Sequence, residues 1–177
     1  MNQQTFIWGS FCLLALGAAL RWPVPTRRFL GGFFILMGLG VNLVYVLLDP
    51  AGFVSIGTDA PLLSAYGWAF STLVAVWPIG FGVMLASYEV ALGTMMIIGG
   101  RPGRWGLLGG IIFLVASTPL NTWTLPNLIL AAALIAILLR EAGPATADAA
   151  GSRSHARGRT AAPSEAAATS SQLGRIA

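Results

Sequence analysis

The chain has 177 residues, of which 56% are apolar and only 9% are charged. Soluble domains carry about 25% charged residues, so this composition excludes an ordinary soluble domain and favours an integral membrane protein. The formal net charge of +4 comes from arginines, which lie between apolar segments or near the C-terminus. That placement explains orientation in a membrane better than binding to nucleic acid, so no nucleic-acid partner is expected.

Cysteine and histidine are too rare in this chain to build the common redox or metal sites. Cys12 is the single cysteine, and His155, the single histidine, lies in a polar region after residue 140. An internal disulfide and a paired-cysteine redox motif are therefore excluded. We expect no haem or metal site from this chain alone.

Five apolar segments predict an all-α fold, a polytopic bundle of transmembrane helices. They cover residues 5–20, 29–48, 78–99, 105–118 and 125–139. The second and third are close to the 20 or so residues that cross a bilayer, whereas the other three need flanking residues. No basic residue precedes the first segment, so we expect it to be a retained helix and not a cleaved signal peptide.

The connection between the second and third spans, residues 49–77, predicts an external loop followed by an interfacial helix. Residues 49–61 contain prolines and glycines that are typical of a loop. Residues 62–76 are apolar and end before Pro78, so a sixth span, a re-entrant segment and a surface helix all remain open. We favour a helix lying on, or dipping into, the outer face. Its expected anchors are Tyr66, Trp68 and Trp77.

The arginines predict the orientation in a cell membrane. With the N-terminus outside, residues 21–28, residues 101–104 and Arg140 all fall inside, while Asp49 and Asp59 fall outside. A sixth span would move the arginines of residues 101–104 to the outer side, which disfavours it. The C-terminus is then cytoplasmic.

Residues 141–177 are rich in small and polar residues and contain few large apolar ones. Such a composition cannot bury enough surface to offset the entropy of ordering. We expect a disordered cytoplasmic tail.

Glu89 is the only charged residue inside an apolar segment. An ionisable group at bilayer depth is costly, which makes it a candidate site by default. Gly82, Ala86, Glu89 and Gly93 recur at helical spacing, so a stripe of small residues should bring a neighbouring helix close and point Glu89 into the bundle. The apolar segments hold no basic partner, so we expect Glu89 to be protonated.

The second span carries a matching stripe. Its members are Gly31, Ile35, Gly38, Asn42 and Tyr45. By helical rise, Gly38 lies at the depth of Glu89 and Asn42 about one turn nearer the outside. We therefore expect Asn42 to be the first-choice partner of Glu89, with the hydroxyl of Tyr45 or Tyr88 next.

Two interpretations of Glu89 stay open at this point. The acid either fixes the pairing of two helices, or it binds a proton or ligand at the bottom of an outward-facing pocket. Because the chain offers one intramembrane carboxyl and no second titratable partner, the sequence favours the first interpretation.

From Arg28 to Leu139, about two thirds of the chain, the sequence resembles the DoxX-like family of small bacterial membrane proteins. The resemblance is carried by RFLGGFFILMG at residues 28–38 and YEVALGTMMIIGGRPGR at residues 88–104. It implies a four-helix core made from the last four spans, with the N-terminal helix as an addition. By position it carries over Glu89, Gly93, Arg101 and Arg104.

The resemblance also suggests what the protein does. Some DoxX-like proteins are subunits of quinone-linked oxidoreductases or act with thiol and oxidative-stress systems, so a quinone is a candidate cofactor. We therefore predict a non-catalytic or accessory membrane subunit whose partners are the lipid bilayer and another membrane or redox subunit. The alternative is a small transporter or channel component that uses Glu89.

An enzyme with its site at the outer face would have to use Asp49 and Asp59. The chain contains no complete catalytic motif, and aspartates in a loop rich in glycine and proline are more often solvated turn residues. The sequence therefore favours a protein that is not an enzyme.

Overall fold

The computed structural model describes residues 3–141, and these form helices and turns without any strand. The predicted all-α bundle is confirmed. Of the expected tail, residues 141–177, all but Glu141 lie outside the described residues. Five of the helices in residues 3–141 are long and apolar enough to cross a membrane, so the chain is a multi-pass membrane protein.

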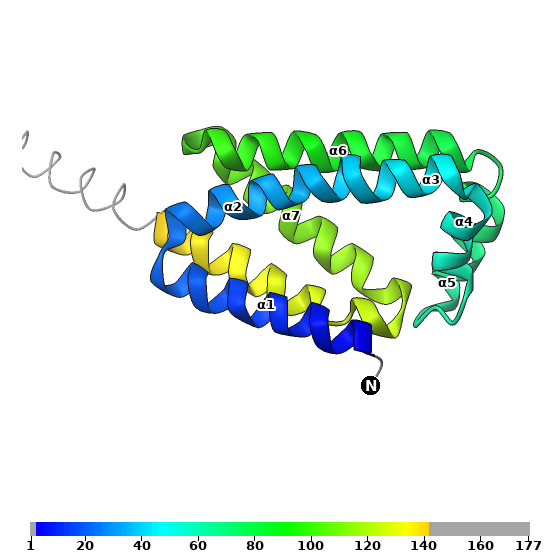
Figure 1. Ribbon diagram of the computed structural model, residues 1–177, viewed down its shortest axis with the longest axis horizontal. Coiled ribbons are helices and arrows are strands. Elements are labelled where there is room, and N and C mark those ends of the chain that lie inside the picture. The colour runs from blue at the N-terminus through cyan, green and yellow to red at the C-terminus, as the bar shows by residue number, and fades with distance from the viewer. Residues whose placement is uncertain (1–2, 142–177) are drawn as a thin grey trace, which may run out of the picture. The chain divides into compact units, whose positions relative to one another are not determined.

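The five long helices follow one another in the order of the predicted spans (Figure 1). They are α1 (Gln3–Arg21), a rod over Pro23–Leu48, α6 (Pro78–Ile98), α7 (Gly100–Ser117) and a helix over residues 127–141. The rod is made of α2 (Pro23–Leu36), the π-helical stretch η1 (Met37–Leu43) and α3 (Val44–Leu48). Two 3₁₀ turns, η3 (Thr118–Leu120) and η4 (Thr122–Thr124), join α7 to the helix over residues 127–141.

Proline starts two of the long helices, and the second span therefore begins earlier than its apolar segment does. Pro23 opens α2 and Pro78 opens α6, each directly after a tryptophan whose backbone is not helical. Proline suits the first turn of a helix, where its missing N–H would have no partner in any case. The connection between the first two helices is consequently reduced to Trp22.

Residues 49–61 are the clearest departure from the predicted loop, since α4 (Pro50–Thr58) is a helix. Asp49 caps it by accepting a hydrogen bond of 2.8 Å from the Gly52 N–H, and Pro50 occupies its first position. The cap and the packing of the buried Phe53 in the second apolar cluster together offset the cost of two internal glycines. The following α5 (Ser64–Ala69) and π-helical η2 (Phe70–Val74) are too short to cross a bilayer and lie with α4 at one end of the bundle.

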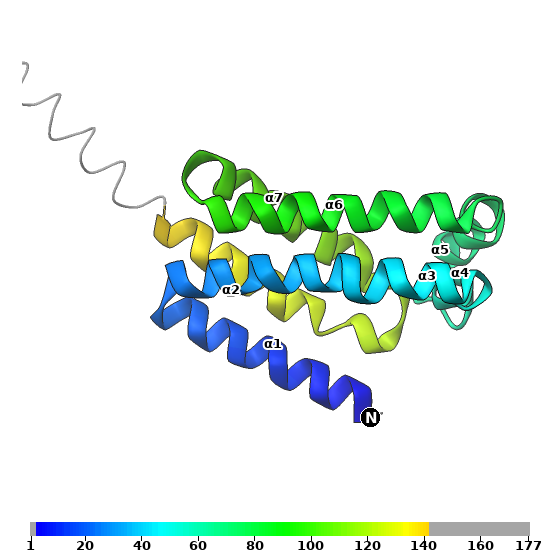
Figure 2. The same cartoon turned by 45° about the horizontal axis from the view of Figure 1, so that its top comes forward.

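α6 is the central helix of the bundle. It runs alongside the rod in both views (Figures 1 and 2) and contacts α7 as well. One apolar cluster joins α1, α2, α6, α7 and the helix over residues 127–141, while a second joins α3, α4, η2 and α6. The two clusters meet α6 at different heights, with Leu92 and Met96 in the first and Phe81 and Leu85 in the second.

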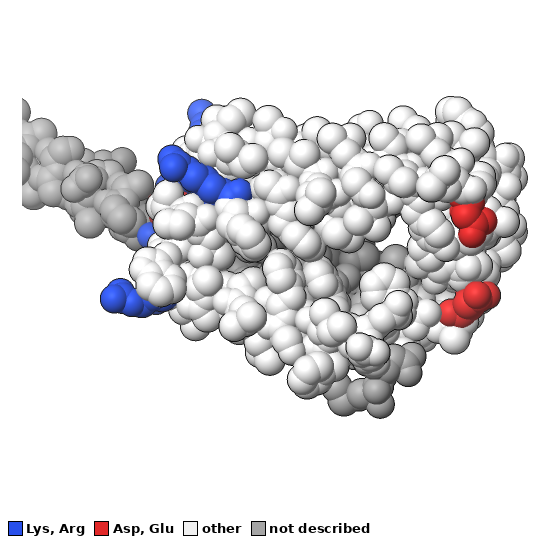
Figure 3. Space-filling view, viewed as in Figure 1, with Lys and Arg blue, Asp and Glu red and all other residues white. Residues whose placement is uncertain are grey.

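Charge is separated along the bundle (Figure 3). Arginines gather at the end where α1 and α6 finish and α7 begins. Asp49 and Asp59 flank α4 at the opposite end. Between these ends the face drawn in Figure 3 shows no charged side chain over about the length of α6, whose 21 residues span roughly the 30 Å thickness of a bilayer's hydrocarbon.

A close backbone contact joins α2 to α6 through glycine. A Cβ built on Gly31 would lie 2.7 Å from the carbonyl oxygen of Gly93, and one on Gly93 would collide with the carbonyl oxygen of Gly31. Side chains larger than hydrogen would therefore push the two backbones apart. Packing of this kind is what drives helix association in lipid.

We predict that Gly31→Ala destabilises the bundle while Gly32→Ala does not. The added methyl at position 31 meets backbone, and such overpacking costs about 1–3 kcal/mol. A Cβ on Gly32 has no atom within 4 Å, so this adjacent exchange is a matched control. Unfolding midpoints in detergent measure the difference, and equal midpoints for the two variants would contradict it.

Candidate functional site

Glu89 lies near the middle of α6 and points into the bundle, with only 2% of its surface exposed. The residues that share its face of α6, namely Gly82, Ala86 and Gly93, are buried with it. The acid therefore sits between the two apolar clusters, at the depth where hydrocarbon surrounds the bundle. A charge there is costly, so its hydrogen-bond partner decides its state and its role.

Asn42 supplies that partner. Its Nδ2 donates a hydrogen bond of 2.6 Å to Oε2 of Glu89 from the neighbouring rod. Gly38, one turn earlier, makes room for the acid, since a Cβ built on it would lie 3.1 Å from the Cβ of Glu89 and 2.9 Å from the carbonyl oxygen of Ala86. The hydrogen bond that the sequence predicted is thus present and depends on the small residues around it.

The rod is π-helical from Met37 to Leu43, the stretch that contains both Gly38 and Asn42. A π-helix closes its hydrogen bonds over five residues instead of four, is rare, and is frequent at functional sites. After this stretch Val46 faces α6, packed against Gly82, with none of its side chain exposed. The wider turn therefore sets which side chains of the rod meet Glu89.

The carboxyl group keeps some unused hydrogen-bonding capacity. Among residues 3–141, no group donates to its second oxygen, Oε1, whereas every fully enclosed side-chain nitrogen and oxygen has a partner. Oε1 therefore remains available for a further hydrogen bond, as an acceptor or, in the neutral acid, as a donor.

Neither tyrosine of the predicted site bonds to Glu89. Tyr88 is 40% exposed, and its hydroxyl donates to the carbonyl oxygen of Gly109 on α7 at 3.2 Å. Tyr45 packs in the second apolar cluster, with its hydroxyl beside Gly52. The structure thus brings Asn42 to the acid and places the two tyrosines elsewhere.

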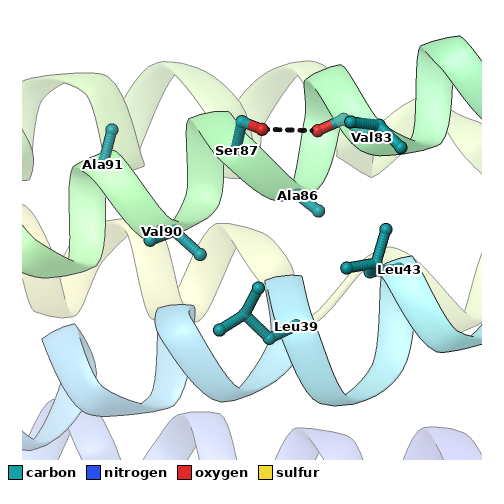
Figure 4. A pocket seen from close by; sticks show the side chains of 7 residues that line it. All are labelled: Leu39, Leu43, Val83, Ala86, Ser87, Val90 and Ala91. Atoms are coloured by element: carbon teal, nitrogen blue, oxygen red, sulfur yellow. Dashed lines mark hydrogen bonds between the residues drawn. The ribbon is translucent and has the colours of Figure 1, made fainter.

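A shallow groove of about 300 Å³ runs between η1 and α6, beside the buried pair (Figure 4). Leu39 and Leu43 of the rod face Val83, Ala86 and Val90 of α6 across it. Its one hydroxyl, on Ser87, donates to the carbonyl oxygen of Val83 within α6 at 2.7 Å. The groove is an apolar surface, and the acid does not line it.

Arg27 is a buried residue that the sequence interpretation treated only as an orientation signal. It is 5% exposed, and its Nη1 donates to the carbonyl oxygen of Met96 in the last turn of α6. The guanidinium packs against Gly99, whose φ of +80° and missing side chain make the space. The negative C-terminal end of the α6 helix dipole stabilises a cation at this position. The sequence did contain a signal for its burial, because Arg27 lies four residues before Gly31 and so falls on the same stripe of the second span.

A second polar group missed in the sequence joins α1 to the helix over residues 127–141. Trp8 donates from its indole nitrogen to Oδ1 of Asn127 at 2.9 Å, and Nδ2 of Asn127 donates to the Ser117 hydroxyl at 3.0 Å. Asn127 is 7% exposed and follows Pro126 at a helix start. These bonds attach α1 to the rest of the bundle.

Across residues 3–141, no three histidine, cysteine or acidic side chains are placed to hold a metal ion. Cys12 is fully buried in the larger apolar cluster. Comparison with protein-family models, curated proteins and solved structures finds no match to this chain. The site therefore has to be interpreted from its own chemistry.

We predict that Asn42 and Glu89 are energetically coupled. A double-mutant cycle with Asn42→Leu and Glu89→Leu should give a coupling free energy of about 0.6 kcal/mol, with an upper value near 1.7 kcal/mol, as measured for hydrogen bonds between membrane helices. Unfolding in mixed micelles provides the four free energies. Strict additivity of the two exchanges would show that the bond contributes nothing.

We also predict that Arg27→Met destabilises the protein while Arg28→Met does not. The first exchange leaves a buried carbonyl group without its charged donor, which costs about 1–3 kcal/mol. Arg28 is exposed, and its exchange changes the net charge equally, so any effect of charge on orientation cancels. Thermal unfolding in detergent separates the two variants, and the prediction fails if their stabilities match.

Proposed function

We propose that this chain is a non-catalytic, accessory subunit held in the cell membrane by its five spans. The observation that carries this proposal is that, apart from Oε1 of Glu89, the buried polar side-chain atoms of residues 3–141 bond to other protein groups. A substrate path needs polar groups that are free to exchange partners, whereas a supporting bundle needs them satisfied internally. Asn42 with Glu89, and Trp8 with Asn127, are such internal pairs.

The proposed orientation places the arginine end in the cytoplasm and the aspartate end outside. This follows the bias of basic residues toward cytoplasmic loops, and it puts the start of α1 outside. Exposed tryptophans support the placement of the two membrane–water interfaces. Trp22 and Trp105 lie near the arginines, and Trp68 and Trp77 lie near the aspartates.

The proposed partner is a quinone-linked or thiol-related redox subunit, as in the DoxX-like family that the sequence resembles. The extended apolar surface of the spans offers contact area for such a partner, and a quinone is the candidate cofactor of the assembly. The support is the similarity of residues 28–38 and 88–104 to that family, together with the contact between α2 and α6, the two helices that hold most of these segments.

A second candidate function is a small transporter or channel component that binds a proton or ligand at Glu89. The free Oε1 and the π-helical stretch beside the acid favour it. In this candidate the acid exchanges its proton as the rod changes its winding.

Purification from native membranes tests the first candidate against the second. We expect a membrane redox subunit to co-purify with the chain, and its retention to be unchanged in Glu89→Gln, because Gln keeps the bond to Asn42. Mass spectrometry identifies the partner, and solvent extraction detects a quinone.

Flux into liposomes containing only this chain is the opposing measurement. Flux that Glu89→Gln abolishes and Ser87→Ala leaves intact would overturn the accessory role in favour of transport. Ser87 is the matched control because it lies on α6 close to the acid but bonds only within its own helix.

A further inference from the structure

A second apolar groove, of about 400 Å³, lies between α1 and α2. Phe11, Leu14 and Ala18 form its α1 side, and Trp22, Pro25 and Phe29 form the other. The single-residue turn at Trp22 holds the two helices together at this end, and the small Ala18 leaves the space between them open. Leu14, Trp22 and Phe29 remain more than half exposed, so the groove opens sideways, toward hydrocarbon.

The closed end of this groove carries positive charge. Arg21 is the last residue of α1, and its guanidinium carbon lies 5.7 Å above the ring of Trp22, which itself lines the groove. Arg28 is also exposed in the first turns of α2. Asp49 and Asp59 flank α4 at the other end of the bundle, and the other acidic residues of the described region, Glu89 and Glu141, do not line the groove.

We propose that this groove binds an anionic phospholipid, with an acyl chain between α1 and α2 and the headgroup phosphate at Arg21. An acyl chain needs an apolar channel along the helices, and a tryptophan is suited to the headgroup level. Arginine pairs with phosphate through charge-assisted hydrogen bonds. In neutral lipids the positive charge of the choline or ethanolamine group weakens this attraction, whereas an anionic lipid has no such charge. Charge complementarity therefore selects the lipid class, and apolar packing selects the place.

This proposal is independent of the accessory role, because it depends only on the α1–α2 groove and Arg21. It also explains why three large apolar or aromatic side chains line an unfilled surface next to a cation. With lipid present, the rings of Phe11, Trp22 and Phe29 gain contacts that the protein does not supply.

The test is retention of lipid by the purified full chain, counted by native mass spectrometry after exposure to phosphatidylglycerol or phosphatidylcholine in mixed micelles. We expect phosphatidylglycerol to be retained in preference, and Arg21→Gln to lower its retention about fivefold, as the loss of one interfacial arginine predicts. Arg101→Gln is the matched control. It removes the same charge at the same end of the bundle but lies in the first turn of α7, away from the groove.

A second variant tests the apolar part of the site. Ala18→Phe fills the groove and should abolish retention of phosphatidylglycerol with Arg21 intact. If this variant does not fold, the comparison of Arg21→Gln with Arg101→Gln still decides the matter, since both side chains are exposed.

Three outcomes would overturn the proposal. Equal retention of the two lipids would show that the headgroup is not recognised. Equal losses in Arg21→Gln and Arg101→Gln would show attraction to the whole basic end and not to a site. A lipid-free dimer that Ala18→Phe disrupts would show that a second copy occupies the groove.

Discussion

The backbone contact between α2 and α6 is the constraint on which the rest of this bundle depends. In lipid there is no gain from hiding apolar side chains from water, so two helices stay together only where they fit closely. Gly31 and Gly93 provide that fit through mutual contact with each other's carbonyl oxygens. This contact brings the two helices close enough for Asn42 to lie opposite Glu89 and bond to it.

The hydrogen bond between Asn42 and Glu89 makes the register of the two helices specific. Sliding one helix along the other by one turn, about 5.4 Å, would separate the amide from the acid and leave both in hydrocarbon without a partner. Close packing alone tolerates several registers wherever small residues repeat. The polar pair penalises the wrong ones, which is a role that needs no catalysis and suits a residue that is 2% exposed.

Much of the site could be predicted from helical spacing, and the part that could not has a physical cause. The stripe of Gly31, Gly38 and Asn42 identified the partner of Glu89, because all three precede or lie within the π-helical stretch. Beyond it the spacing changes, so Val46 and not Tyr45 faces α6. A pattern based on 3.6 residues per turn cannot anticipate a local change of winding.

The burial of Arg27 and the helix α4 were not predicted, for a different reason. The burial of Arg27 depends on groups distant in sequence, and α4 depends on its N-terminal cap. Arg27 is buried only because the chain turns at Gly99 with positive φ. Residues 49–77 contain no helix long enough to span a membrane, and they close the other end of the bundle. The Leu62 N–H donates to the carbonyl oxygen of Pro119 at 3.0 Å, and Nδ2 of Asn121 donates to that of Asp59 at 3.2 Å. Polar contacts therefore hold both ends of the bundle, and Glu89 is kept in place between them.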